Sequence, residues 1–97
     1  MLTGKQRAYL RSLANTLDSI FQVGKEGISE SFIAQINDAL EARELIKLNV
    51  LSNAPAEIDE VAQKLQHACS AEVVQKIGNR IILYRQSKQN RSIILPG

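Results

Sequence analysis

The feature of this chain that most limits its fold is a regular alternation of helix-like and strand-like segments. Apolar residues recur at the three- and four-residue spacing of an amphipathic helix in some segments, and short runs rich in β-branched residues separate and follow these segments. Helices are predicted at about 4–17, at 30–43 and from Pro55 onward, and strands at 19–23, 45–51, 72–77 and 80–85. The expected order of elements is therefore α-β-α-β-α-β-β.

This order predicts an α/β protein, a two-layer sandwich built around a mixed four-stranded sheet. Two strand-helix-strand units imply partly parallel pairing with right-handed crossovers. The pair Gly78-Asn79 between the last two β-rich runs indicates an antiparallel hairpin. The basic tail 86–97 ends in Ile93-Ile94-Leu95, which we expect either to pack back on the body or to pair as an extra edge strand.

Capping residues indicate where the helices begin. Thr3 precedes the first helix and Ser29 the second, and the hydroxyl of each can accept a hydrogen bond from a free backbone N–H. Pro55 is expected in the first turn of the third helix, where a proline removes no hydrogen bond. The carboxylates that follow it would also lie near that helix start, where negative charge is stabilising.

Length and composition indicate one globular domain, residues 1–97. The apolar share is 44% and the charged share 23%, which excludes disordered and low-complexity classes. No apolar run approaches the ~18 residues of a membrane span. Lys5, Arg7 and Arg11 interrupt the N-terminal segment, so no signal peptide is expected. The single cysteine excludes a disulfide framework, and we expect a cytoplasmic monomer.

Charge is unevenly distributed along the chain. Residues 1–27 carry four basic and two acidic groups, residues 28–70 three basic and seven acidic, and residues 71–97 five basic and one acidic. The three segments therefore have net charges of +2, −4 and +4. If both ends of the chain meet on one side of the fold, that side is a basic patch. Charge alone is equally compatible with cations scattered over the whole surface.

A glycine-rich segment, Gly24-Lys25-Glu26-Gly27, lies between a predicted strand and a capped helix. Glycines allow positive φ and a close approach of the backbone to a ligand. The N-terminus of the following helix offers free N–H groups and a positive dipole end, and both favour phosphate. A GXXG loop of this kind can clamp a nucleic-acid backbone, although the same spacing also fits a tight turn with an incidental lysine.

Five separate motifs carry a resemblance to a known family. They are LTGKQRAYLRSLA (2–14), VGKEGIS (23–29), ELIKLNVL (44–51), IGNRIILYR (77–85) and ILP (94–96). The chain resembles the CRM domain, and most closely its bacterial stand-alone, YhbY-type form. The resemblance implies a fold like the C-terminal domain of translation initiation factor three. It also implies RNA binding through the GXXG loop and association with precursors of the large ribosomal subunit.

The leading hypothesis is therefore a non-catalytic RNA-binding protein of ribosome assembly that needs no cofactor. The loop and the helix N-terminus would grip the RNA backbone, and Arg7 and Arg11 would flank the loop. The expected RNA-binding residues are Gly24, Lys25, Glu26, Gly27, Lys5, Arg7, Arg11, Arg80, Arg85, Lys88 and Arg91. The expected partner is ribosomal RNA of the large-subunit precursor, with ribosomal proteins as additional partners and no membrane.

Two other functions fit parts of the sequence. An acidic helix surface would bind a basic ribosomal or assembly protein through Glu30, Asp38, Glu41 and Glu44. A small phosphotransfer or hydrolytic enzyme has only the glycine loop in its favour, because no acid/base set accompanies it.

The remaining chemistry-bearing residues predict no further site. His67 and Cys69 stand two positions apart on a helix and point in different directions, so no metal site is expected. Tyr84 either stacks a base or covers the sheet, and the sequence leaves both open.

Overall fold

The computed structural model describes residues 2–97 and has the predicted order of elements. Its helices and strands are α1 (Gly4–Ala14), β1 (Ser19–Val23), α2 (Glu30–Arg43), β2 (Leu45–Val50), α3 (Ile58–Cys69), β3 (Glu72–Ile77) and β4 (Arg80–Tyr84). Thr3 caps α1 within a capping box, and Ser29 caps α2, which confirms both predicted N-caps.

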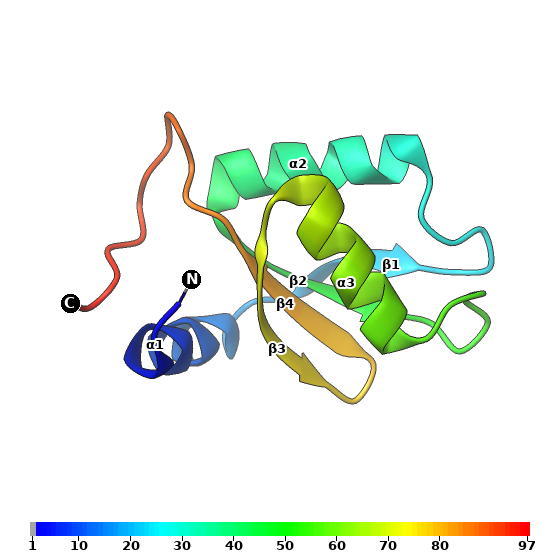
Figure 1. Ribbon diagram of the computed structural model, residues 1–97, viewed down its shortest axis with the longest axis horizontal. Helices are drawn as coiled ribbons and strands as arrows, with labels where there is room; N and C mark the ends of the chain where they lie inside the picture. The colour runs from blue at the N-terminus through cyan, green and yellow to red at the C-terminus, as the bar shows by residue number, and fades with distance from the viewer. Residues whose placement is uncertain (1) are drawn as a thin grey trace.

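The strands form one sheet in the order β1-β2-β4-β3 (Figure 1). β1 and β2 run parallel, whereas β2 pairs with β4, and β4 with β3, in antiparallel fashion. The mixed four-stranded sheet is confirmed, and so is the closing hairpin. β4 lies between β2 and β3, so only one pair of neighbouring strands is parallel.

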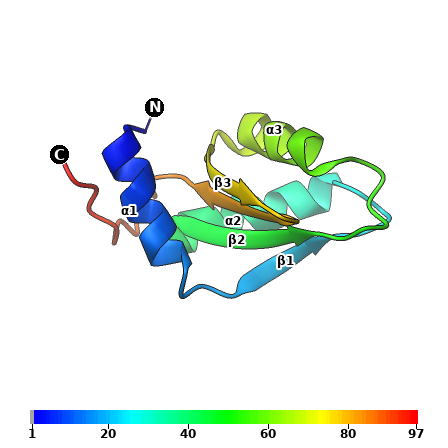
Figure 2. The ribbon, with the colours of Figure 1, turned by 90° about the horizontal axis from the view of Figure 1, so that it is seen from below.

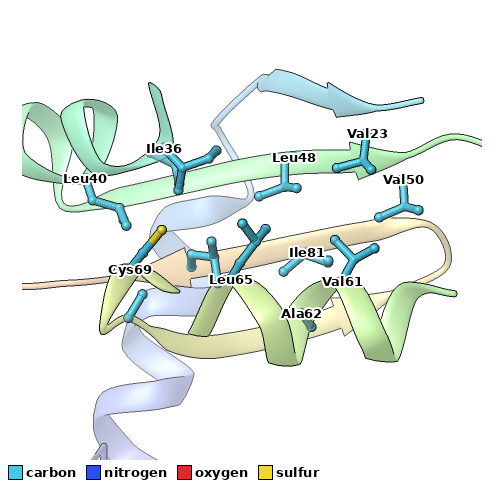
Figure 3. Packing of buried hydrophobic residues seen from close by; sticks show 13 residues of the cluster. Val23, Ile36, Leu40, Leu48, Val50, Val61, Ala62, Leu65, Cys69 and Ile81 are labelled. Carbon is cyan, nitrogen blue, oxygen red and sulfur yellow. The ribbon is translucent and has the colours of Figure 1, made fainter. Parts of the chain in front are cut away.

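The main core lies between the sheet and the two helices α2 and α3 (Figure 3). Alternate residues of β2 point into it, and α2 contributes Ile36 and Leu40 while α3 contributes Val61 and Leu65. Phe21 and Phe32 join the rim of this core in an edge-to-face contact, with ring centroids 6.0 Å apart. This layer is the predicted α/β sandwich.

α1 packs on the other face of the sheet and only at one end (Figure 2). Leu10 and Ala14 of α1 contact a smaller cluster on that face, formed by Leu45, Ile82 and Tyr84 among others. The sandwich therefore gains a short third layer at this end. Tyr84 is only 5% exposed, so the two alternatives for this residue resolve in favour of covering the sheet.

Two predicted helix boundaries were wrong. α1 ends at Ala14 rather than 17, because three-residue turns at Thr16 and Leu17 redirect the chain into β1. α3 begins at Ile58, so Pro55 is not in its first turn. Pro55 instead packs on the GXXG loop, where its Cγ lies 3.1 Å from the position that a Cβ at Gly27 would take.

The tail 86–97 packs back on the body and forms no strand. Ile93 and Leu95 lie on the α1 cluster, and the Gln6 side chain donates to the Pro96 carbonyl at 3.2 Å. This long-range bond brings the two ends of the chain together, as Figure 1 shows.

A buried carboxylate at the C-terminal end of α2 holds the tail in place. Glu44 is fully buried and accepts hydrogen bonds from the backbone N–H groups of Ser87, Ser92 and Ile93 at 2.8, 2.8 and 2.9 Å. Burial by itself raises the pKa of Glu44, but these hydrogen bonds together outweigh it and leave the pKa below its ordinary value.

Glu41 lies one turn earlier and binds the same tail. Its carboxylate accepts from the Ser87 hydroxyl at 2.6 Å and from the Gln89 N–H at 3.1 Å, and the Ser87 bond is the main reason why the pKa of Glu41 is lowered. Two of the four carboxylates in the predicted acidic surface are thus occupied by the chain itself. Of the predicted acidic surface, Glu30 and Asp38 remain exposed.

Candidate nucleic-acid interface

The GXXG segment forms a single tight turn at the end of β1. The Gly27 N–H donates to the Gly24 carbonyl at 3.0 Å, and Gly27 adopts a φ of +69°, which favours glycine. A Cβ at Gly24 would make only ordinary contacts, so one of the two glycines is required by backbone geometry. Lys25 and Glu26 form the exposed tip of the turn.

The turn leads directly to the N-terminus of α2. The Ser29 hydroxyl accepts from the Phe32 N–H at 3.1 Å, and the Ser29 carbonyl accepts the first helical bond, from Ile33, at 3.0 Å. The N–H groups of Glu30 and Ser31 have no intrahelical acceptor at this position. Free donors and the positive end of the helix dipole therefore face the loop.

A polar groove of about 380 Å³ lies between the loop, the start of α2 and β1. Its lining residues are Gln22, Gly24, Lys25, Glu26, Gly27, Ser29, Ser31, Phe32 and Gln35. Amide and hydroxyl groups, backbone N–H groups and one cation are the usual partners of RNA phosphate and sugar groups. The groove is therefore suited to a short stretch of nucleic-acid backbone.

Arg80 is the other predicted cation at this end of the sheet. It begins β4 opposite Asn49, which in turn pairs with Gln22 beside the loop. Arg80 and Lys25 are exposed, and neither forms an ion pair within residues 2–97. Both are available to a ligand.

Helix α1, which carries Lys5, Arg7 and Arg11, lies at the opposite end of the sheet (Figures 1 and 2). Leu45 of β2 contacts the α1 cluster, whereas Val50 at the other end of β2 pairs with Val23 beside the loop. Five strand steps separate these ends by about 17 Å. Arg7 and Arg11 therefore do not flank the loop, contrary to the prediction, and Lys5 lies on the same remote helix.

Two predicted RNA-binding arginines hold the fold together. The Arg7 guanidinium donates to the carbonyls of Val73 and Val74 at a bulge in β3. The Arg85 guanidinium donates to Asn37 Oδ1 and to the Cys69 carbonyl, both at 2.7 Å, and so joins α2 to α3. These bonds hold both guanidinium groups within the fold.

The two tail cations stand at the far end of α2 from the loop. Arg91 Nε donates to the Ser87 carbonyl at 3.0 Å, and the Lys88 N–H donates to Glu41. The 14 residues of α2 span about 21 Å. The predicted set thus divides into Lys25 and Arg80 beside the loop, and the other cations near the meeting chain ends.

A comparison with family models adds independent evidence. The model of the CRS1/YhbY (CRM) domain matches residues 2–85. The chain belongs to the CRM family. This confirms the resemblance carried by the five motifs and agrees with the α/β fold.

Several CRM relatives match over nearly their whole length. The probable RNA-binding protein YqeI of Bacillus subtilis is 52% identical over 96 residues, which is 99% of this chain and 100% of the relative. An RNA-binding protein of Haemophilus influenzae is 32% identical and is covered to 89%. The solution structure of the Staphylococcus aureus protein SAV1595 superposes with a TM-score of 0.81 at 55% identity, covering 99% of this chain and 100% of that one.

Nothing in the described part of this CRM domain suggests catalysis or metal binding. Residues 2–97 contain no group of three or more His, Cys, Asp or Glu side chains placed to share a metal ion. Burial raises the pKa of the Cys69 thiol, which makes it a poor nucleophile. Among the same residues, no helix is long and apolar enough to cross a membrane. The two relatives above carry the names probable RNA-binding protein and RNA-binding protein.

Sequence reasoning missed two residues next to the loop. Gln22 lines the groove, and Asn49 lies beside it on β2. The available signal was the alternation along the strands, which directs Lys47 and Asn49 away from the main core. Pro55 was assigned to a helix, although it supports the loop.

Proposed function

We propose that this chain is a cytoplasmic, non-catalytic RNA-binding protein that holds the RNA backbone in the groove between the GXXG loop and the N-terminus of α2. The observation that carries this proposal is the exposed Lys25 turn beside free helix N–H groups. The relatives named as RNA-binding proteins support the same conclusion.

The RNA partner in this proposal is ribosomal RNA of the large-subunit precursor, and the function is ribosome assembly. Support comes from the resemblance of five motifs in this chain to the stand-alone, YhbY-type form of the domain. One copy of the domain spans residues 2–85 of this chain.

Two double variants with the same charge change test the position of the site. Lys25→Ala/Arg80→Ala removes two cations from the loop end, and Lys5→Ala/Arg11→Ala removes two from the α1 end. We expect the loop-end variant to bind ribosomal RNA more weakly, with the slope of log affinity against log salt reduced by about 0.7–0.9 per lost contact. A larger loss in the α1-end variant would move the site to the other end of the sheet.

Sedimentation through a low-salt sucrose gradient of cell lysate tests the cellular partner. The wild-type protein should migrate with the large subunit or its precursors, and the loop-end variant should remain at the top. RNase treatment should release the wild-type protein. Association that survives RNase would instead indicate a protein partner and contradict the proposal.

A further inference from the structure

One face of the sheet is only partly covered. α2 and α3 pack on one side, whereas α1 packs on the other side only at one end, on the cluster that contains Leu45, Ile82 and Tyr84 (Figure 2). Towards the GXXG loop this second side carries no helix among the described residues. We call this uncovered part the open face.

The strand register gives the open face two rows of side chains. The row nearest the loop consists of Gln22, Asn49, Arg80 and Ile77. The next row, at the border with the α1 cluster, consists of Ser19, Lys47, the buried Ile82 and Gln75. Neither row contains an acidic side chain. Four of the eight side chains carry amides or a hydroxyl, two are cations, and Ile77 remains 57% exposed.

This composition favours nucleic acid over an apolar protein partner. Amide side chains present donors and acceptors together, as the edges of nucleobases do. The side chains of Lys47 and Arg80 form no ion pair or hydrogen bond within residues 2–97, so both can contact phosphates. Bases can lie on the exposed aliphatic surface of Ile77, although neither row has an aromatic ring for strong stacking.

The Asn49 side chain is already oriented for contact with a base. The Ser19 hydroxyl donates to Asn49 Oδ1 at 3.0 Å, which fixes the orientation of the amide on the open face. Asn49 Nδ2 has no acceptor among the described residues. A donor that is already oriented loses little side-chain freedom when it binds the acceptor of a base.

The open face is continuous with the groove at the loop. Gln22 belongs to the first row and also lines the groove that contains Lys25 and the start of α2. An RNA strand that leaves the groove therefore passes directly onto Gln22 and Asn49. In an RNA duplex the Watson–Crick edges are paired and the major groove is too narrow for side chains, so a single strand is the form that offers Watson–Crick edges to these amides.

We propose that the open face binds the bases of a single-stranded RNA whose backbone is held at the GXXG loop. This inference rests on the proposed function and adds the form of RNA that is bound and the residues that contact its bases. Gln22 and Asn49 are the base-contacting residues, and Lys47 and Arg80 hold phosphates on either side of them.

The test compares binding of a single-stranded RNA of about ten nucleotides with binding of the same RNA annealed to its complement. Gln22→Ala/Asn49→Ala removes the two amides without changing charge. Gln63→Ala/Gln66→Ala is the matched control, because it removes two exposed amides from α3 on the other side of the molecule. Lys25→Ala reports separately on the loop, and thermal melting verifies that each variant is folded.

We expect the open-face variant to bind the single strand about tenfold more weakly, with the salt slope and the duplex affinity unchanged. The α3 control should match the wild type, and Lys25→Ala should weaken binding of both RNAs. An open-face variant that binds the single strand like the wild type, or loses both RNAs equally, overturns the inference. If Lys25→Ala also leaves binding unchanged, the proposed function fails as well.

Discussion

The two ends of α2 differ in how many of their polar groups are hydrogen-bonded within the chain. At the N-terminal end Ser29 provides one cap, and the loop beside it is exposed and closed by one backbone bond. At the C-terminal end Glu44 is fully buried, and three backbone N–H groups of the tail surround its carboxylate. The same helix therefore leaves hydrogen-bonding groups free at one end and saturates them at the other.

The difference shows which end serves stability and which serves binding. No buried side-chain N or O atom lacks a partner among the described residues, so the interior polar groups are satisfied. The N–H groups at the start of α2 can remain free only because water reaches them. A ligand that replaces this water there needs no rearrangement of the core.

Loss of the Glu44 carboxylate should produce the largest effect at the saturated end. Glu44→Ala removes the acceptor of the Ser87, Ser92 and Ile93 N–H groups, so we expect the free energy of unfolding to fall by about 2–4 kcal/mol. Urea unfolding measures the change, and hydrogen exchange should show the tail opening. Glu30→Ala at the free end is the control, and an equal loss in both variants would contradict the comparison.

Low pH should have the next largest effect, because it should reduce the stability that Glu44 and Glu41 provide at the C-terminal end of α2. The pKa values of Glu44 and Glu41 are lower in the folded protein than their ordinary value of 4.5. Their contribution to stability is therefore complete above about pH 4.5 and is lost as the pH falls through the folded values. Urea midpoints measured between about pH 6 and 3 should fall more steeply for the wild type than for Glu44→Ala. Parallel curves would contradict this role.

Adding a side chain at Gly27, in the turn before α2, should have a moderate effect on stability. Gly27→Ala places a Cβ 3.1 Å from Pro55 Cγ at a φ of +69°, so we expect a loss of about 1 kcal/mol. Gly4→Ala in the open first turn of α1 should be neutral or stabilising by up to about 0.5 kcal/mol. Thermal melting compares the two variants. A neutral Gly27→Ala would show that the turn does not need glycine.

The smallest effect on stability should come from the residue most important for binding. Lys25→Ala removes an exposed side chain that has no partner within residues 2–97, so the free energy of unfolding should change by less than about 0.5 kcal/mol. RNA affinity should nevertheless fall, because one phosphate contact is lost. Urea unfolding and RNA titration of the same preparation separate the two effects. A clear loss of stability in Lys25→Ala would contradict the expectation that the N-terminal end of α2 serves binding and not stability.

Local patterns in the sequence predicted most of the fold. The period of apolar residues located all seven elements, and the hydroxyls of Thr3 and Ser29 located two helix starts. The start of α3 was wrong because the proline preference for a first turn is local, whereas Pro55 packs on Gly27, 28 positions earlier in the chain. Such a contact exists only after the chain has folded.

The candidate site was predictable only in part, for the same reason. Two glycines at fixed spacing before a capped helix identified the loop. Whether an arginine side chain is free to bind a ligand depends instead on hydrogen-bond acceptors that lie far away in the sequence. The acceptors of Arg7 lie 66 and 67 positions away in the sequence, and those of Arg85 lie 16 and 48 positions away. The positions of lysines and arginines in the sequence therefore do not show which of them stabilise the fold and which are free to bind RNA.

The contact of Arg7 with β3 has a consequence for self-association. β3 is an edge strand, and the unpaired carbonyls of an edge can recruit a strand from another molecule. Arg7 places its charged group on two of these carbonyls, at a bulge that already breaks the regular spacing of the strand. An incoming strand would have to displace a cation and match a distorted register. We therefore expect Arg7 to hinder the pairing of this edge with a strand of another molecule.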